Sequence, residues 1–321
     1  MQNVKAVFLD AASMGEDLDF SPLEGTGVEL VCWPQTCPEQ VAERLSGAGV
    51  AIVNKVILSR EVLEACPDLR VIAVTATGMN NVDLEAAQAL GIRVFNVTHY
   101  GTDAVVQHAL TLMLALCTRL VDYVQDVRAG MWQQASQFCL MHHPVREVAG
   151  KTLVVVGYGD LGQRMASVCR ALGMTVRVAS RPGQPGGVRK GVEYLPFDAA
   201  LAEADVLSLH CLLSPETERM INARTLALMK PGALLINTAR GGLIDEPALL
   251  DALKSGHLGG AGLDVLSSEP PRDGNPLLDA GLPNLLITPH CAWVSREARQ
   301  RLIDRTAENI RNGLKILEVT P

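Results

Sequence analysis

Short apolar runs alternate with helical patterns over the first hundred residues. Runs rich in Val, Ile, Leu and Ala predict strands at 6–9, 28–32, 50–53, 71–74 and 94–97. Between them lie amphipathic stretches such as 38–45 and 83–90, the second with Asp83 at its N-cap position and Gly91 as its stop. Strands that alternate with helices indicate βαβ units and a parallel sheet.

A long helical pattern over 102–128 interrupts this alternation. The segment after it, "GMWQQASQFCLMHHPVREVAG", has no clear period and is rich in large side chains. We expect it to form a linker or arm that buries its apolar groups against another surface, such as a second subunit.

From Lys151 the alternation restarts and predicts a second α/β domain. Its strands are predicted at 153–156, 175–179, 206–209, 234–237, 262–265 and 285–288. A final helix over 295–317 follows, with the length to cross back and cover the first domain.

Composition supports this picture and excludes several partners. The 321 residues have room for about two domains, and 48% hydrophobic with only 4% aromatic residues is typical of buried parallel strands under helices. A net charge of -7 argues against a nucleic acid or an anionic membrane, because either needs a concentrated basic face. No signal-peptide pattern is present, and the apolar segment 104–116 is too short for a membrane span, so we expect a cytoplasmic protein.

The eight cysteines stand apart in apolar contexts and form no CxxC pair. Free thiols in a reducing compartment therefore fit better than disulfides or zinc. On this ground we expect no metal site.

Three glycines with GxGxxG spacing follow the first strand of the second domain, in "VVVGYGDLG". The motif opens a helical pattern over 161–172, and another strand follows that helix. In such a loop Gly157 permits the tight turn, Gly159 lets a pyrophosphate approach the backbone, and Gly162 allows close helix packing. A strand meeting a tight turn is the alternative, but this context predicts a dinucleotide site.

Ser180 and Arg181 stand at the end of the next strand, where an NAD site usually has Asp or Glu for the ribose hydroxyls. Without that carboxylate a 2′-phosphate is not repelled, and a guanidinium can bind it through two parallel hydrogen bonds. NADP is therefore the favoured cofactor. The alternative is an NAD enzyme of relaxed specificity in which Arg181 is solvated.

Three further stretches near the ends of predicted strands, "INTARGGLID", "GLDVLSSEPP" and "TPHCAW", contain Arg240, Glu269 and His290. The carboxyl ends of parallel strands form the usual ligand crevice of an open α/β sheet. Each residue could instead have a purely structural role. Arg240 could form an ion pair, Glu269 could cap a turn, and His290 could be a core histidine with its hydrogen bonds satisfied.

Taken together, these motifs resemble the D-2-hydroxyacid dehydrogenase family, and "ATGMNNVD" with "PHCAW" is most similar to its glycerate dehydrogenase or hydroxypyruvate reductase branch. The resemblance covers essentially the whole chain. It implies a flavodoxin-like substrate domain from residues 1–98 and 291–321, and a doubly wound Rossmann domain from 99–290 that binds the dinucleotide. It also implies a homodimer with its interface on the helix and arm around 102–150.

The same resemblance implies that His290 protonates the emerging alkoxide, that Glu269 favours the charged imidazole, and that Arg240 grips the substrate carboxylate. In the first domain it implies that the backbone of Thr77 and Gly78 binds that carboxylate. Lys55 is either a further charge there or an ordinary surface lysine, and Trp293 lies either at the active-site edge or in the core. Cofactor contacts are implied for Thr102, Gly157, Gly159, Asp160, Leu161, Gly162, Ser180, Arg181, Cys211, Thr217, Thr238, Ala239, Asp264 and His290.

The predicted function is NAD(P)-dependent interconversion of a small 2-keto acid and its D-2-hydroxy acid, with hydroxypyruvate or glyoxylate as leading substrates and D-glycerate or glycolate as products. A phosphite dehydrogenase of the same superfamily is an alternative; formate enzymes lack the acidic partner present here as Glu269. A dinucleotide-sensing interaction protein similar to the C-terminal-binding-protein corepressors is another, since that class keeps the fold and the same three residues.

Overall fold

The computed structural model describes residues 4–319 and divides into two compact α/β units. Unit 1 holds the described residues up to Gly101 and those from Val294 on, and unit 2 runs from Thr102 to Trp293. Both units are built on parallel sheets, which confirms the predicted fold class.

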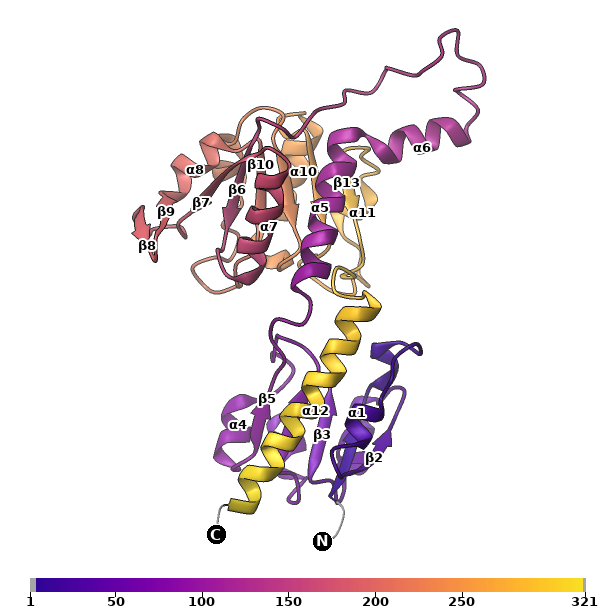
Figure 1. Cartoon of the computed structure of the whole chain (residues 1–321), viewed down its shortest axis with the longest axis vertical. Coiled ribbons are helices and arrows are strands. Elements are labelled where there is room, and N and C mark those ends of the chain that lie inside the picture. The colour runs from indigo at the N-terminus through magenta and orange to yellow at the C-terminus, as the bar shows by residue number, and fades with distance from the viewer. Residues whose placement is uncertain (1–3, 320–321) are drawn as a thin grey trace. The chain divides into compact units, whose positions relative to one another are not determined.

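Unit 1 has a five-stranded parallel sheet with helices on both faces (Figure 1). The strand order β2-β1-β3-β4-β5 is the flavodoxin-like arrangement. The strands are β1 (Lys5–Phe8), β2 (Glu29–Cys32), β3 (Val50–Val53), β4 (Val71–Val74) and β5 (Arg93–Phe95).

Two sets of helices cover the faces of this sheet. One face packs on α2 (Val41–Leu45), α3 (Arg60–Glu64) and α4 (Leu84–Ala89), with the short η2 (Pro38–Gln40) before them. The side chain of Asp83 accepts the N–H of Ala86, which confirms the predicted N-cap of α4. The other face is crossed by α12 (Arg296–Val319), with α1 (Ser21–Glu24) beside it and η1 (Ala11–Met14) after β1.

Unit 2 has an eight-stranded sheet in the order β13-β12-β11-β10-β6-β7-β9-β8. Seven strands are parallel and spread outward from β6 in both directions, which is the doubly wound Rossmann order. The strands are β6 (Thr152–Val156), β7 (Thr175–Ala179), β8 (Gly187–Arg189), β9 (Val192–Leu195), β10 (Val206–Leu209), β11 (Leu234–Asn237), β12 (Gly260–Leu263) and β13 (Leu285–Ile287).

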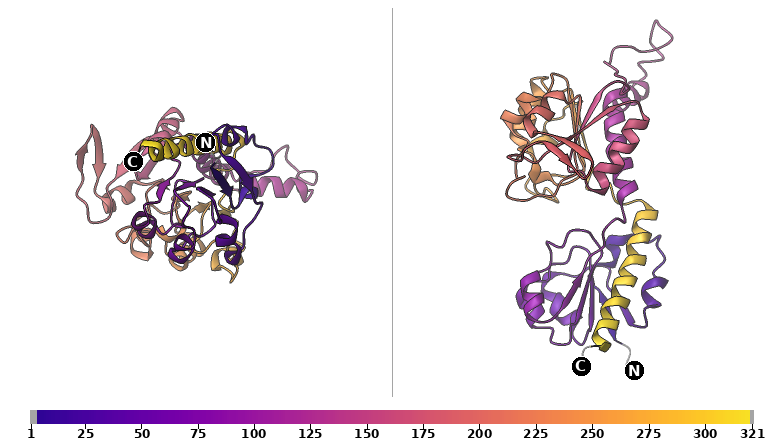
Figure 2. Two further views of the ribbon diagram at one scale, coloured as in Figure 1. Left: turned by 90° about the horizontal axis from the view of Figure 1, so that it is seen from below. Right: turned by 60° about the vertical axis from the view of Figure 1, so that its left-hand side comes forward.

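The sheet of unit 2 has helices on both faces (Figure 2). Its central strands bury side chains on both faces, as the continuous apolar runs predict. Leu153 and Val155 pack with α5 (Thr102–Thr118) and α7 (Asp160–Ala171). Val154 and Val156 alternate with them and face the helices of the other layer. That layer contains α8 (Phe197–Glu203), α9 (Ala223–Leu228), α10 (Glu246–Lys254) and α11 (Pro276–Asp279), with η3 (Gly241–Leu243) before α10.

The single helix predicted over 102–128 was wrong. The chain breaks at Arg119, which has φ 53, and α6 (Leu120–Arg128) continues at 62° to α5. The guanidinium of Arg119 pairs with Asp122 at 2.7 Å across this bend. Within the described residues no single helix is long and apolar enough to span a membrane. In that part of the chain only α5 and α6, taken together as one bent segment, reach the length and hydropathy of a membrane span.

The hairpin of β8 and β9 was not predicted. Its two strands have only three and four residues and mix apolar residues with charged ones and glycine, so the apolar pattern is too short to predict a strand there. The hairpin extends the sheet beyond β7, next to the loop that contains Ser180 and Arg181.

Candidate active site

The three predicted catalytic residues stand on turns at one edge of the unit 2 sheet. Arg240 follows β11, Glu269 lies in the loop after β12, and His290 follows β13. Because β11, β12 and β13 are neighbouring parallel strands, their carboxyl ends meet at the same edge.

His290 and Glu269 form a direct pair. Nδ1 of His290 lies 2.6 Å from Oε2 of Glu269, and Oε1 of Glu269 accepts the N–H of Leu266 at 2.9 Å. About a third of each of the two paired side chains is exposed, at 35% and 34%. With Nδ1 bound to Glu269, any further partner of the His290 imidazole would bind at Nε2.

The carboxyl group of Glu269 is held in its ionised form. Burial alone would raise its pKa, but the hydrogen bonds from His290 and from the N–H of Leu266, with the charges of His290 and Arg240, lower the pKa below its ordinary value. The ionised carboxylate of Glu269 thus places a negative charge directly beside the imidazole of His290.

Asp264 holds the turn that carries His290. Its buried carboxylate accepts the N–H of Cys291 at 2.9 Å and of Ala292 at 2.8 Å, and its backbone carbonyl accepts the N–H of His290 at 2.8 Å. These bonds stabilise the left-handed conformation of His290, at φ 52, which costs a non-glycine residue about 1–3 kcal/mol. The indole of Trp293 donates to the carbonyl of His290 at 3.0 Å, so Trp293 supports the same turn.

Arg240 reaches this edge because Gly241 allows a very close approach of two turns. A Cβ on Gly241 would lie 1.9 Å from the backbone of Leu266. The buried side chain of Asn237 fixes the turn by donating to the carbonyl of Arg240 at 2.9 Å and accepting the N–H of Ala239 at 3.0 Å. The turn of Arg240 and the loop of Glu269 are therefore packed against each other.

Two residues that position this edge were missed by sequence reasoning. Glu246 is buried, and its carboxylate accepts both the N–H and the hydroxyl of Ser267 (2.8 and 2.7 Å), which fixes the loop containing Glu269. Nε2 of His108, on α5, lies 2.8 Å from the hydroxyl of Thr288, directly after β13. Neither residue belongs to a motif, and only the fold shows these contacts.

The glycine loop after β6 has the shape that a dinucleotide requires. Gly157 has φ +92, and a Cβ there would lie 2.6 Å from the backbone of His210 and Cys211. A Cβ on Gly162 would lie 2.0 Å from the carbonyl oxygen of Gly157, so α7 packs directly on the loop. A Cβ on Gly159 would meet no atom within 4 Å. This open space beside the start of α7, which also carries Asp160 and Leu161, fits a pyrophosphate.

Ser180 is buried at the end of β7, and its hydroxyl donates to the carbonyl of Pro185 at 2.9 Å. Arg189, on β8, donates to the same carbonyl at 2.7 Å and to Oγ of Ser180 at 3.4 Å, with its guanidinium over the ring of Tyr194. Arg181, which adjoins Ser180, is exposed. Two guanidinium groups therefore accompany Ser180, and sequence reasoning found only one because the hairpin was not predicted.

The remaining predicted cofactor residues differ in what they do. The hydroxyl of Thr217 donates to the carbonyl of Leu212 at 2.7 Å and so shapes the loop after β10. Oγ1 of Thr238 is buried with no hydrogen-bond partner among the described residues, which suits a group whose partner is a ligand. The assignment of Thr102, Cys211, Thr217, Thr238, Ala239 and Asp264 to cofactor binding stays a prediction.

Unit 1 brings its own predicted residues to one sheet edge. Lys55 follows β3, and Thr77 and Gly78 follow the neighbouring parallel strand β4. The side-chain amide of Asn81 donates to a carbonyl of the Lys55 loop at 2.9 Å, and Asp10 accepts the N–H of Lys55 at 2.6 Å. The substrate role of these residues stays a prediction.

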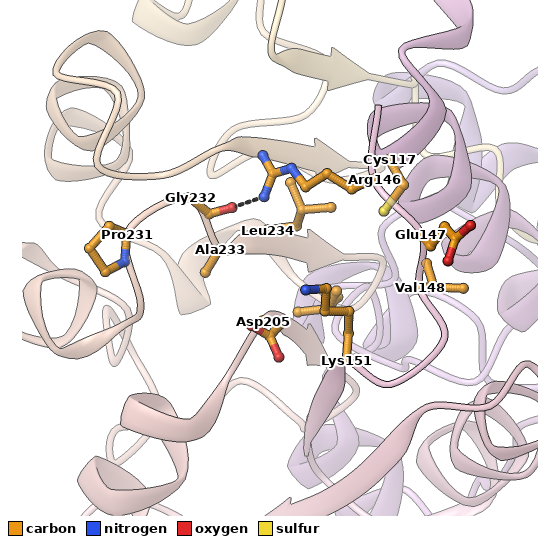
Figure 3. A pocket seen from close by; sticks show the side chains of 11 residues that line it. Cys117, Arg146, Glu147, Val148, Lys151, Asp205, Pro231, Gly232, Ala233 and Leu234 are labelled. Atoms are coloured by element: carbon orange, nitrogen blue, oxygen red, sulfur yellow. Dashed lines mark hydrogen bonds between the residues drawn. The ribbon is translucent and has the colours of Figure 1, made fainter. Parts of the chain in front are cut away.

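A cavity of about 180 Å³ lies at the opposite edge of the unit 2 sheet (Figure 3). Its lining includes Lys151, Asp205 and Ala233, which stand directly before β6, β10 and β11. Arg146 reaches across it to donate to the carbonyl of Gly232. The cavity is thus separate from the edge that carries the predicted catalytic residues.

Known proteins resemble this chain over nearly its whole length. Residues 110–292 match the family model "D-isomer specific 2-hydroxyacid dehydrogenase, NAD binding domain". The chain is 46% identical over 308 residues to a glycerate dehydrogenase of Methylorubrum extorquens, covering 95% of each. It is 39% identical over 316 residues to a hydroxypyruvate reductase of Blautia hydrogenotrophica, covering 97% of this chain and 97% of that one. The solved structure of the TT0316 protein from Thermus thermophilus aligns with a TM-score of 0.83 at 35% identity, covering 97% of both chains.

Two glycine substitutions in the loop after β6 should separate stability from cofactor binding. Gly162→Ala should destabilise the fold by about 1–3 kcal/mol, because its Cβ overlaps a backbone oxygen. Gly159→Ala should leave the melting temperature unchanged and weaken dinucleotide binding, because its Cβ enters only open space. Thermal unfolding and fluorescence titration with NADPH and NADH measure the two effects. Wild-type dinucleotide affinity in Gly159→Ala would contradict the assignment of the loop.

Proposed function

Because the chain belongs to the D-isomer specific 2-hydroxyacid dehydrogenase family, we propose that it is an NAD(P)-dependent oxidoreductase that interconverts a small 2-keto acid and its D-2-hydroxy acid. The observation that carries this proposal is the 2.6 Å contact between His290 and Glu269, at the sheet edge that also carries Arg240. The names of two relatives favour hydroxypyruvate and D-glycerate as the substrate pair, with glyoxylate and glycolate as smaller analogues.

Each of the three residues has one chemical task. When bound, the dinucleotide supplies the hydride that reduces the carbonyl carbon. His290 donates the proton that the carbonyl oxygen needs, and Glu269 orients the imidazole and stabilises its charged form. Arg240 binds the substrate carboxylate and polarises the carbonyl. In the oxidative direction, neutral His290 accepts the hydroxyl proton.

We assign dinucleotide binding to unit 2 and, within unit 1, substrate-carboxylate binding to the backbone of Thr77 and Gly78. NADP is the preferred cofactor in this proposal. No carboxylate stands at the end of β7, where it would repel a 2′-phosphate, and Arg181 and Arg189 lie beside Ser180 at that position. NAD is the alternative cofactor, and it requires that neither guanidinium contacts the ribose.

Initial rates of NADPH and NADH oxidation with hydroxypyruvate, glyoxylate, pyruvate and phenylpyruvate test the proposed function. We expect turnover with hydroxypyruvate or glyoxylate and its loss in His290→Asn, with dinucleotide affinity retained. Dinucleotide binding without turnover of any keto acid would instead favour a sensing protein. The names of the relatives do not favour that alternative.

We also propose a homodimer formed through α6 and the arm after it. This part of unit 2 exposes many apolar side chains: Leu120, Val121, Val124, Val127, Met131, Trp132, Phe138, Met141 and Val145. Phe138 is 88% exposed, and monomeric proteins rarely expose a contiguous apolar patch of this kind. The eight free cysteines support a cytoplasmic location, which we propose as well.

Glu269→Gln should move the pH profile of keto-acid reduction. The pKa of Glu269 is lowered, so in the wild type its charge persists through the neutral range and favours protonated His290. That charge is lost only as the pH falls through the lowered pKa of Glu269. Glu269→Gln removes the charge at every pH, so kcat at neutral pH should fall by about tenfold or more, and any acid-side decline caused by Glu269 should be absent. The pH dependence of kcat, with chemistry shown to limit the rate, measures both effects, and a wild-type profile in Glu269→Gln would contradict the role of the pair.

Arg181→Ala and Arg189→Ala should each weaken NADPH binding by about tenfold or more and leave NADH binding nearly unchanged, because only the 2′-phosphate needs a guanidinium. Arg177→Ala is the matched control, since Arg177 lies within β7, four residues before Arg181, and pairs with Glu203 at 3.1 Å. KM values for both cofactors measure the effect. Equal losses of NADPH and NADH affinity would contradict the assignment of NADP as the preferred cofactor.

Val124→Glu with Val127→Glu should convert the dimer to monomers, because two buried charges would oppose the apolar contact. Light scattering after gel filtration gives the mass. Ile57→Ser, which changes a still more exposed apolar residue of unit 1 (68% against 39% and 42%), should leave the mass unchanged. A double variant with the mass of the wild-type protein would place the interface elsewhere.

A further inference from the structure

The arm of unit 2 contains a cluster of ligand-type side chains that the proposed reaction does not use. Nε2 of His142 lies 2.9 Å from Oδ2 of Asp126, and Nε2 of His143 lies 2.7 Å from the same oxygen. Asp126 belongs to α6, whereas the two histidines lie 16 and 17 residues later, where the chain returns from the arm. Three potential ligand atoms from two segments therefore converge on one point.

Packing holds the two imidazole rings in this arrangement. Their centroids are 4.2 Å apart, and the edge of the Tyr123 ring contacts both, at 5.9 Å from His142 and 4.9 Å from His143. The side chains of Asp126 and His143 are mostly covered, at 16% and 20% exposed, whereas His142 is 42% exposed. The cluster is thus partly shielded and open to solvent on the side of His142.

We propose that Asp126, His142 and His143 form a binding site for a divalent transition-metal ion of the zinc type. Two imidazole nitrogens and one carboxylate oxygen are ligands that such ions prefer, and three protein ligands leave a fourth position for water. In a tetrahedral site with bonds of about 2.0–2.1 Å, ligand atoms lie about 3.3 Å apart. All three ligand atoms already lie within 4.8 Å of one another, so small shifts of the side chains admit the ion.

Metal binding needs only a change of tautomer at each histidine. In the metal-free cluster each Nε2 donates its proton to Asp126. With the ion bound, that proton moves to Nδ1 of the same ring, and Nε2 offers its lone pair to the metal. The cysteines, on which the expectation of no metal site rested, play no part in this cluster.

A second group, His108, Asp264 and Cys291, also has ligand atoms within 4.8 Å of one another. The carboxylate of Asp264 already accepts the N–H groups of Cys291 and Ala292, and both bonds hold the turn of His290. A metal ion there would have to break that turn. In the arm cluster the ion would break no turn. The two hydrogen bonds from the histidines to Asp126 would be replaced by bonds from the same side chains to the ion.

The ion would join α6 to the returning chain and thereby stabilise the arm. An ion that binds only the folded arm raises the stability of the protein with its concentration. Oxygen-preferring cations such as Mg²⁺ bind imidazole poorly and should not replace the zinc-type ion. The proposal is independent of the substrate and of the dinucleotide.

The test is isothermal titration of Zn²⁺ into the full-length, untagged protein after removal of metals with a chelator. We expect about one ion per chain, and at least about tenfold weaker binding in Asp126→Asn and in His143→Ala. Cys291→Ser should bind Zn²⁺ like the wild type, and Mg²⁺ should give no heat.

Thermal unfolding provides the second measurement. Zn²⁺ should raise the melting temperature of the wild-type protein but not that of His142→Asn, which changes the most exposed side chain of the cluster and should leave the fold intact. Failure of the wild type to retain Zn²⁺ would overturn the proposal. So would wild-type affinity in both Asp126→Asn and His143→Ala, or loss of the ion in Cys291→Ser, which would place the metal at the other group.

Discussion

The hydrogen bonds between Asp264 and the turn after β13 are the contacts on which the proposed catalytic edge depends. His290 adopts a left-handed conformation that a histidine does not favour, and three N–H groups in succession, of His290, Cys291 and Ala292, bind Asp264. Because Asp264 is almost fully buried, its carboxylate depends on protein donors, which include the N–H groups of Cys291 and Ala292 and the hydroxyl of Thr288. The direction of the His290 side chain, and with it the contact to Glu269, follows from that turn.

The same construction recurs at the other two turns of this edge. A buried polar side chain holds each one: Asn237 bonds the turn of Arg240, and Glu246 bonds the loop of Glu269 through Ser267. Each of these buried side chains has backbone or hydroxyl hydrogen-bond partners. Its position is therefore more firmly fixed than that of an exposed side chain. Gly241 adds the close approach without which Arg240 would stand apart from Glu269. The three residues proposed for catalysis therefore stand on turns that buried side chains hold in place.

Sequence patterns predicted the features that depend on neighbouring residues and missed those that depend on contacts between distant parts of the chain. Apolar runs and the glycine spacing located the strands and the loop of Gly157, because each depends on a few neighbouring residues. The break at Arg119 escaped because a left-handed residue leaves no mark on helical periodicity. Arg189 and His108 escaped because their partners are distant in the sequence or lie in an unpredicted hairpin. The roles of Arg240, Glu269 and His290 came from a family resemblance, and no spacing rule alone supplies them.

The order of strands in unit 2 separates the residues proposed to select the cofactor from those proposed for acid chemistry. Ser180, Arg181 and Arg189 lie on the β7 side of β6, whereas Arg240, Glu269 and His290 lie on the β11 to β13 side. The glycine loop after β6 lies between the two sets in the strand order, at the point where a doubly wound sheet usually binds its ligand. No hydrogen bond found among the described residues links the two sets directly. Substitutions beside Ser180 can therefore change which dinucleotide binds while the contact between His290 and Glu269 stays intact, since that contact depends on Asp264 and not on β7.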